Sequence, residues 1–292
     1  MEMKTNKEEE VEWATTVWSH LTALRDRSPL IQCITNFVSM DLVANTLLSA
    51  GASPAMIHSQ QEFSDFTPHA HALYVNVGTL SPDWLSSMKA AALLANDLRK
   101  PWVLDPVAAG SSQFRLNACL ELLLLKPTVI RGNASEIIAL SQAGIDMGPT
   151  KGVDSCHESM DAVEAAKFLA EKSGSIVAVS GAVDIICSSK SITHGDRLVF
   201  VHNGVPMLQK ITATGCAVTA LIAAFVAAAD PLHAFDATVS ALSVFAIAGE
   251  MGMELAKGPA SLRMHLIDSL YGLDQPALLS RINITGLSCH NT

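Results

Sequence analysis

Apolar residues follow two alternating patterns along the chain. Short runs of Val, Ile and Leu are typical of strands in a sheet covered on both faces, whereas apolar residues repeating every three or four positions are typical of helices. The short runs cover residues 72–77, 101–105, 128–131, 176–180 and 183–188. The helical pattern covers residues 39–50, 82–99, 116–125, 133–142 and 158–172, and three strongly apolar helices are expected to begin near residues 214, 233 and 259.

The alternation of strands and helices predicts an α/β fold with a mostly parallel central sheet and helices on both faces. Asn203-Gly204 lies between two strand-like runs, 198–202 and 205–209, and predicts a hairpin that adds an antiparallel edge. Neither an internal repeat nor a Pro/Gly/Ser-rich linker interrupts the pattern, which favours a single domain. We expect residues 1–28 to form an N-terminal extension with a helix, and residues 29–292 to form the domain.

The composition limits the partners. Hydrophobic residues make up 49% of the chain and charged residues 16%, against about 25% charged in ordinary domains. This balance excludes disorder and predicts that part of the surface is buried against other subunits. The net charge of −9 argues against nucleic acid, whose phosphates require clustered Lys and Arg.

One uncharged segment, residues 211–229, is long enough to cross a membrane. It begins with polar residues and ends at Asp230-Pro231, so we expect a buried core helix and no membrane partner. The acidic N-terminus lacks the features of a signal peptide. Six scattered cysteines without a CxxC pair predict reduced thiols and a cytoplasmic location.

Candidate chemistry gathers where the predicted strands end. Asp105, Arg131 and Ser180 each end a strand, and parallel sheets bind ligands beyond the carboxyl ends of their strands. The segment Thr212-Ala213-Thr214-Gly215-Cys216 opens the most apolar helix, so its N–H groups could hold an anion and the helix dipole would lower the pKa of the Cys216 thiol. Alternatively, Thr214 caps the helix and Cys216 is a small core residue.

Two carboxylates and an arginine complete the set. Asn133-Ala134-Ser135-Glu136 matches a capping box, and a carboxylate in that turn could also hold a magnesium-bound water. Asp105 either forms a turn or adds a second magnesium carboxylate. Arg131 is either solvated or pairs with a phosphate. Together they fit magnesium-assisted phosphoryl transfer. The sequence has neither GxxxxGK[ST] nor GxGxxG after a strand, so the residues indicate an alcohol kinase outside the P-loop class.

An ordered series of segments between residues 29 and 270 resembles the hydroxyethylthiazole kinase family of the ribokinase-like superfamily. The segments are residues 34–36 (ITN), 51–56 (GASPAM), 75–80 (VNVGTL), 104–107 (LDPV), 130–137 (IRGNASEI), 151–154 (KGVD), 180–184 (SGAVD) and 212–216 (TATGC). The resemblance implies a single-domain ribokinase-like sandwich. It also implies that ATP and Mg²⁺ serve to phosphorylate the hydroxyl of 4-methyl-5-(2-hydroxyethyl)thiazole in thiamine biosynthesis or salvage.

The resemblance also implies roles for individual residues. Met56, Asn36 and Ala213 would contact the thiazole, Arg131 and Ser180 would bind ATP, and Asp105 and Glu136 would serve magnesium through its waters. Cys216 would act at the substrate hydroxyl. Members of the family are homotrimers with the thiazole pocket between subunits, which implies the same assembly here.

Three positions bear on how closely the chain follows the family that it resembles. Ala213 stands where the family usually has Gly, and Ser180 where it often has Thr, which keeps the hydroxyl. Sugar and pyrimidine kinases of the superfamily carry Asp as the base at the position of Cys216. We therefore expect Cys216 to assist by positioning and partial proton acceptance. Ala213 also leaves open a catalytically weak thiazole- or nucleotide-binding regulatory protein on the same fold, and a hydroxymethylpyrimidine or sugar kinase is a further alternative.

Overall fold

The computed structural model describes residues 6–143, 158–189 and 197–286. Segment 151–154, which contributes to the family resemblance, lies outside the described residues, as do Cys156 and Cys289. The four described cysteines, Cys33, Cys119, Cys187 and Cys216, are all free thiols.

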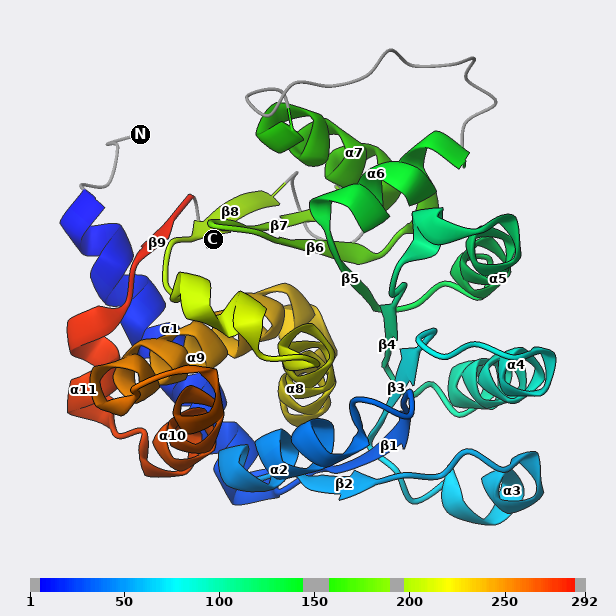
Figure 1. The fold of residues 1–292 in the computed structure, drawn as a ribbon, viewed down its shortest axis with the longest axis horizontal. Coiled ribbons are helices and arrows are strands. Elements are labelled where there is room, and N and C mark those ends of the chain that lie inside the picture. The colour runs from blue at the N-terminus through cyan, green and yellow to red at the C-terminus, as the bar shows by residue number, and fades with distance from the viewer. Residues whose placement is uncertain (1–5, 144–157, 190–196, 287–292) are drawn as a thin grey trace.

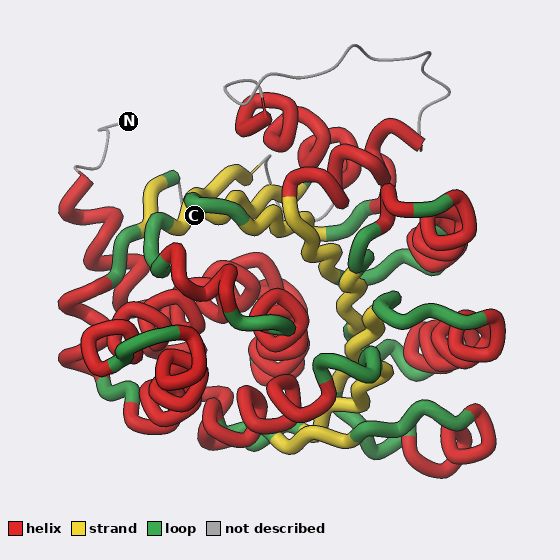
Figure 2. The backbone as a smooth tube through the Cα atoms, viewed as in Figure 1, coloured by secondary structure: helices red, strands yellow, loops and turns green. Residues whose placement is uncertain are grey.

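A nine-stranded sheet runs through the molecule (Figures 1 and 2). Its spatial order is β2 (Ser53–Ala55), β1 (Leu30–Ile34), β3 (Ala72–Asn76), β4 (Trp102–Asp105), β5 (Val129–Asn133), β6 (Ile176–Ser180), β7 (Asp184–Ser188), β8 (Arg197–Val201) and β9 (Ile284–Thr285). All pairs from β2 to β6 are parallel, and those from β6 to β9 are antiparallel. The predicted α/β fold with a mostly parallel sheet is therefore confirmed.

Helices cover both faces, and each face has its own apolar cluster. One face carries α1 (Asn6–Arg27), α2 (Met40–Ala50), α8 (Thr214–Ala228), α9 (Ala234–Leu255), α10 (Pro259–Gly272) and α11 (Gln275–Arg281). The other carries α3 (Phe63–Phe66), α4 (Pro82–Asp97), α5 (Gln113–Leu123), α6 (Ala134–Ala143) and α7 (Glu158–Ser173). Short 3-10 helices are η1 (Gln60–Glu62), η2 (Ala109–Ser111), η3 (Pro206–Lys210) and η4 (Pro231–His233).

Successive side chains of a strand point to opposite faces of the sheet, so every second residue of a strand faces α8. In β4, Trp102 and Leu104 belong to the cluster under α4 and α5, whereas Val103 belongs to the cluster around α8. Asp105 therefore shares the α8 face with Val103. By the same alternation Tyr74 and Asn76 of β3 lie on the α8 face, and the register pairs Asn76 directly with Asp105. The sheet thus presents these polar groups to one helix.

The segment tested as a membrane span is a core helix. α8 occupies Thr214–Ala228, and eleven of its residues are buried. Among the described residues, the helical region Pro231–Leu255 is long and apolar enough to cross a membrane, but 89% of its apolar window is buried inside the protein. Both helices owe their composition to this central position, since a helix buried all round has no polar face.

The predicted hairpin at Asn203-Gly204 is wrong. β8 ends at Val201, and the following residues enter η3 at Pro206, which has no N–H for a strand ladder. The Asn203 amide donates to Glu250 of α9, 3.0 Å, and to the carbonyl of Arg281, 2.7 Å. These tertiary contacts outweigh the local turn preference. The antiparallel edge exists nonetheless, because β8 pairs with β7 and β9.

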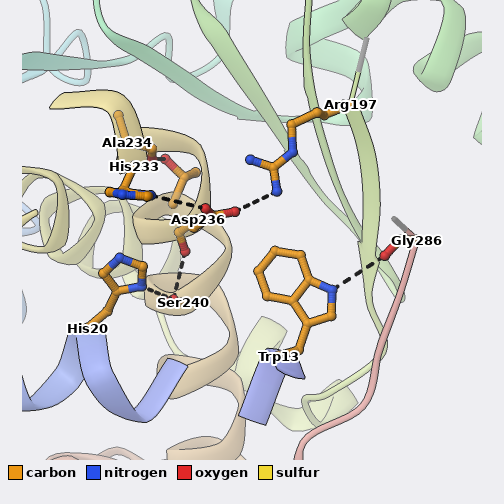
Figure 3. A network of polar contacts seen from close by, with 9 residues as sticks. Trp13, His20, Arg197, His233, Ala234, Asp236, Ser240 and Gly286 are labelled. Carbon is orange, nitrogen blue, oxygen red and sulfur yellow. Dashed lines mark hydrogen bonds and ion pairs between the residues drawn. The ribbon is translucent and has the colours of Figure 1, made fainter. Parts of the chain in front are cut away.

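Helix α1 packs against α8, α9, α11 and β9. Figure 3 shows the polar contacts on this side of the fold. The Trp13 indole N–H donates to the carbonyl of Gly286, and His20 pairs with Ser240 of α9 at 2.9 Å. Asp236 in the first turn of α9 forms an ion pair with Arg197 of β8 at 2.6 Å. The expected helix before residue 28 is present, while the division into an extension and a domain at that residue stays a prediction.

Candidate active site

The turn after β5 is built around Glu136. Its Oε2 accepts the N–H of Asn133 at 2.7 Å, and the Asn133 side chain accepts the N–H of Glu136 at 2.9 Å. This reciprocal pair is a capping box. The other oxygen, Oε1, accepts the N–H of Ala108 at 2.8 Å, which ties the turn to the loop after β4. Glu136 therefore lies beside the loop that Asp105 begins, and the two predicted carboxylates are neighbours.

Asp105 is buried, with 1% of its surface exposed. Its Oδ2 accepts the Tyr74 hydroxyl at 3.1 Å and the Asn76 amide at 2.8 Å. The pKa of Asp105 is raised to about 6: burial raises it most and Glu136 adds to this, whereas Arg131 and the hydroxyl donors lower it. At neutral pH the site therefore contains a negative charge, which the charge of Arg131 stabilises most and hydrogen bonds stabilise further.

A polar chain links Asp105 to Asn36 and Cys216. The Asn36 amide donates to Asn76 Oδ1 at 2.8 Å and lies 3.6 Å from the Cys216 sulfur. Gly78 makes room for Asn36, because a Cβ there would lie 2.5 Å from the Asn36 amide nitrogen. The sequence-predicted residues Asn36, Cys216 and Asp105 are thus brought together.

The expected lowering of the Cys216 pKa is wrong. Burial raises the pKa of the thiol to about 11, and the charge of Asp105 raises it too, against weaker lowering by Asn76, Asn36 and Arg131. Cys216 is in the first turn of α8, but the helix N-terminus does not compensate for lost hydration and a nearby carboxylate. In this structure the thiol is protonated at neutral pH.

Arg131 lies two residues before the end of β5 rather than at it. Its side chain crosses to β6, where Nε donates to the Ser180 hydroxyl at 2.9 Å and Nη2 at 2.5 Å. A Cβ on Gly215 would lie 2.7 Å from Arg131 Nη1. Glycine at this place therefore lets the guanidinium touch the N-terminus of α8, where an anion would gain both charge and N–H donors.

A pocket of about 360 Å³ adjoins these residues. Polar and apolar side chains both line it: the lining includes Arg131, Ser180, Asp184, Thr214, Gly215, Val205, Pro206, Leu208, Leu242 and Phe245. Asp184 Oδ1 accepts the N–H of Gly181 at 3.0 Å and so shapes the loop after β6. Burial raises the pKa of Asp184 to about 6, although Arg131 and the Gly181 N–H lower it. The pocket suits a ligand with an anionic end and a flat apolar end.

Ala213 is the N-cap of α8 and has φ +69° and ψ 7°, in the left-handed region. That conformation costs an L-residue about 1 kcal/mol or more, and glycine adopts it without strain. The methyl group thus sits on a strained backbone within the segment predicted to hold an anion, and this cap makes no side-chain hydrogen bond.

Met56 lies beyond the Asn36 end of the site. Its sulfur is 3.8 Å from the Thr35 hydroxyl, and the side chain packs partly buried against the α8 cluster. His58 accepts the N–H of Thr35 at 3.1 Å and hydrogen bonds to the backbone of Met56, so it holds the two segments together. Burial lowers the pKa of His58, which keeps the ring nitrogen free to accept.

Tyr74, Asn76, His58 and Asp184 were not singled out from the sequence. Within the predicted strand 72–77, Leu73, Val75 and Val77 are apolar, whereas Asn76 is an amide on the opposite face. An amide inside a doubly covered strand needs buried partners. This amide within an otherwise apolar strand was the feature of the sequence that could have identified Asn76.

The sheet, the carboxylates at its edge and the pocket at the N-terminus of α8 define a kinase with a ribokinase-like fold. The comparison with protein families narrows this class. The model of the hydroxyethylthiazole kinase family matches residues 21–276, and the chain belongs to that family of phosphotransferases.

Known proteins of the family are similar over nearly the whole chain. A hydroxyethylthiazole kinase of Arabidopsis thaliana is 66% identical over 282 residues, covering 97% of this chain and 99% of its own. A second, from Zea mays, is 60% identical over 283 residues, with 96% and 97% covered. The solved hydroxyethylthiazole kinase protein of Pyrococcus horikoshii superposes with a TM-score of 0.84 at 37% identity, covering 94% of this chain and all of that one.

More distant structures share the fold alone. The pyridoxal kinase of Staphylococcus aureus in complex with AMP-PCP and pyridoxal has a TM-score of 0.57 at 15% identity, with 88% of this chain and 98% of that chain covered.

Replacing Ala213 by Gly should stabilise the protein. Relief of the left-handed strain exceeds the extra entropy that Gly gives the unfolded chain, so we expect a gain of roughly 0.5–1 kcal/mol by urea unfolding. Ala90→Gly in the middle of α4 is the matched control and should cost about 1 kcal/mol. Equal losses in both variants would contradict the strain at Ala213.

Asp105→Asn should stabilise the ligand-free protein in a pH-dependent way. The folded pKa near 6 lies above the usual 3.8, so the folded protein binds the extra proton and the wild type loses stability as pH rises from about 4 to 6. Above pH 6 the variant should be more stable by at most about 3 kcal/mol. Urea titrations from pH 4 to 8 check this, and an advantage that is constant over this range would contradict it.

Proposed function

We propose that the chain transfers the terminal phosphate of ATP to the hydroxyl of 4-methyl-5-(2-hydroxyethyl)thiazole, a step of thiamine biosynthesis or salvage. The family membership supports the activity. The observation that carries the mechanism is the meeting of Arg131, Ser180, Asp105 and Cys216 around the N-terminus of α8. An anion cradle, a guanidinium and carboxylates are the groups that phosphoryl transfer requires.

ATP would occupy the pocket beside β6. The apolar wall formed by Val205, Leu208, Leu242 and Phe245 suits the base, and the polar end suits the phosphates. Arg131 is already aimed by its two bonds to Ser180, so it can pair with a phosphate at little entropic cost. N–H groups at the start of α8 add further donors.

Magnesium is the proposed cofactor, and two carboxylates fit it through waters. Among the described residues no group of three or more His, Cys, Asp or Glu could hold a metal directly. Glu136 uses each oxygen for a backbone N–H, and each oxygen retains a lone pair for a water. Bound magnesium would neutralise charge on the phosphates. Asp105 and Glu136 would orient its waters, as this ion keeps several.

The thiazole alcohol would lie between Met56, Asn36 and Ala213, with its hydroxyl toward Cys216. The thiol, whose pKa is about 11, is a poor base in the resting protein. Cys216 therefore positions the hydroxyl through a weak hydrogen bond to its sulfur. The proton leaves to an oxygen of the transferred phosphate or to water, and the preorganised charges supply most of the rate.

A homotrimer with sites between subunits is proposed as the active assembly, and the cytoplasm as its location. Phe37 and Val38, directly after Asn36, are 70% and 61% exposed. Such apolar side chains beside a substrate residue favour cover by a neighbouring subunit. Free, buried Cys33, Cys119 and Cys187 support a reducing compartment.

The first experiment is a kinase assay on the purified protein with ATP and magnesium, with and without hydroxyethylthiazole. We expect a phosphorylated thiazole, detected by mass spectrometry, that forms only when both substrates are present. Omitting magnesium should abolish the product. Tight thiazole binding without turnover would instead favour the regulatory binder to which Ala213 points, and turnover of a pyrimidine or sugar alcohol alone would indicate another kinase of the fold.

Cys216→Asp should be at least as active as the wild type. A carboxylate is a stronger base than a protonated thiol at the same position, and the donors for the phosphates, Arg131 and the N–H groups of α8, are kept. The ratio of kcat values for hydroxyethylthiazole measures this. A fall of about a hundredfold or more would show that the thiol itself is required.

A further inference from the structure

Asn76 occupies the centre of the polar chain. Its side chain is completely buried, and all of its hydrogen-bonding groups have partners. Nδ2 donates to the Tyr74 hydroxyl at 2.7 Å and to Asp105 Oδ2 at 2.8 Å. Oδ1 accepts from the Asn36 amide and from the N–H of Gly78, each at 2.8 Å. An amide can donate two hydrogen bonds from its nitrogen and accept two at its oxygen in this way.

These contacts connect the two halves of the site. Asp105 lies at the end of β4 and faces the phosphate end, whereas Asn36 follows β1 and contacts Cys216. β3 lies between β1 and β4 in the sheet, and its last residue is Asn76. The strand order therefore makes Asn76 the natural bridge between the carboxylate and the acceptor side.

We propose that Asn76 is a positioning residue, which fixes the Asp105 carboxylate relative to Asn36 and so sets the alignment of phosphate donor and acceptor alcohol. Tyr74 assists by adding a second donor to the same oxygen, Oδ2 of Asp105. The inference rests on the proposed function, because it assigns Asp105 a task at the phosphates.

Asn76→Asp tests the donor half of the bridge. The substitution keeps the shape and an oxygen that accepts from Asn36 and Gly78, but it turns an oxygen toward Asp105. We expect kcat to fall about a hundredfold, since a misplaced group of this kind costs that much. The KM for hydroxyethylthiazole should change by less than about threefold, because the Asn36 contact survives and uniform binding is kept. Tyr74→Phe should lower kcat roughly tenfold.

The exchange variant Asn76→Asp/Asp105→Asn separates positioning from stability. It restores a donor and an acceptor between the two positions and so should recover the melting temperature lost in Asn76→Asp, but kcat should remain about a hundredfold low because the charge has moved. Thr67→Val is the control. It removes a buried bond to Gln32, 2.8 Å, elsewhere in the fold, and should lower the melting temperature without changing kcat.

The outcomes separate the inference from the function on which it rests. If Asp105→Asn keeps the wild-type kcat, the proposed task of Asp105 is wrong and the inference is wrong with it. If Asp105→Asn is inactive while Asn76→Asp turns over like the wild type, the inference alone is wrong. Recovery of kcat in the exchange variant, or a large rise in KM with kcat unchanged in Asn76→Asp, would overturn it as well.

Discussion

The buried charge of Asp105 is the constraint on which the site depends. A carboxylate with 1% of its surface exposed loses nearly all of its hydration, and its pKa rises to about 6 as a result. Tyr74 and Asn76 of β3 and Arg131 of β5 hold the charge in place from two different strands. The site therefore depends on the sheet. A buried carboxylate stays ionised only if donors lie close to it, and the register of the neighbouring strands places them there.

The site also requires that polar side chains approach the backbone closely, above all at the start of α8. Gly215 admits the Arg131 guanidinium, and Gly78 admits the Asn36 amide. Ala213 takes up the left-handed cap between η3 and α8, with a methyl group that the backbone tolerates only under strain. Small residues thus allow charged and polar side chains to share a space that larger ones would fill. Backbone strain at such a place is typical of functional sites.

The sequence predicted the elements well and their tertiary contacts less well. Periodicity located α2, α4, α6 and α8 and the central strands to within a few residues, since each is amphipathic or continuously apolar. It failed at Asn203-Gly204, where contacts from Glu250 and Arg281, distant in sequence, replace the turn. Motif reasoning chose Asp105, Glu136, Arg131 and Ser180 but overlooked Tyr74 and Asn76. Cys216 is another case in which local sequence was not enough. Its place at a helix N-terminus suggested a lowered thiol pKa, but burial by segments distant in sequence raises that pKa.

The packing of α1 has a consequence for the order in which the protein can fold during synthesis. α1 leaves the ribosome before any strand, yet its partners α8, α9, α11 and β9 come from the last third of the chain. The apolar side chains of α1 that are buried in the folded protein therefore stay largely exposed to solvent until almost the whole chain has been made. These are Trp13, Val17, Leu21 and Leu24. Contacts of such long sequence separation fold slowly and expose apolar surface meanwhile. Until the last third of the chain is made, a nascent chain therefore exposes most of the apolar face of α1, a surface of the kind that chaperones bind.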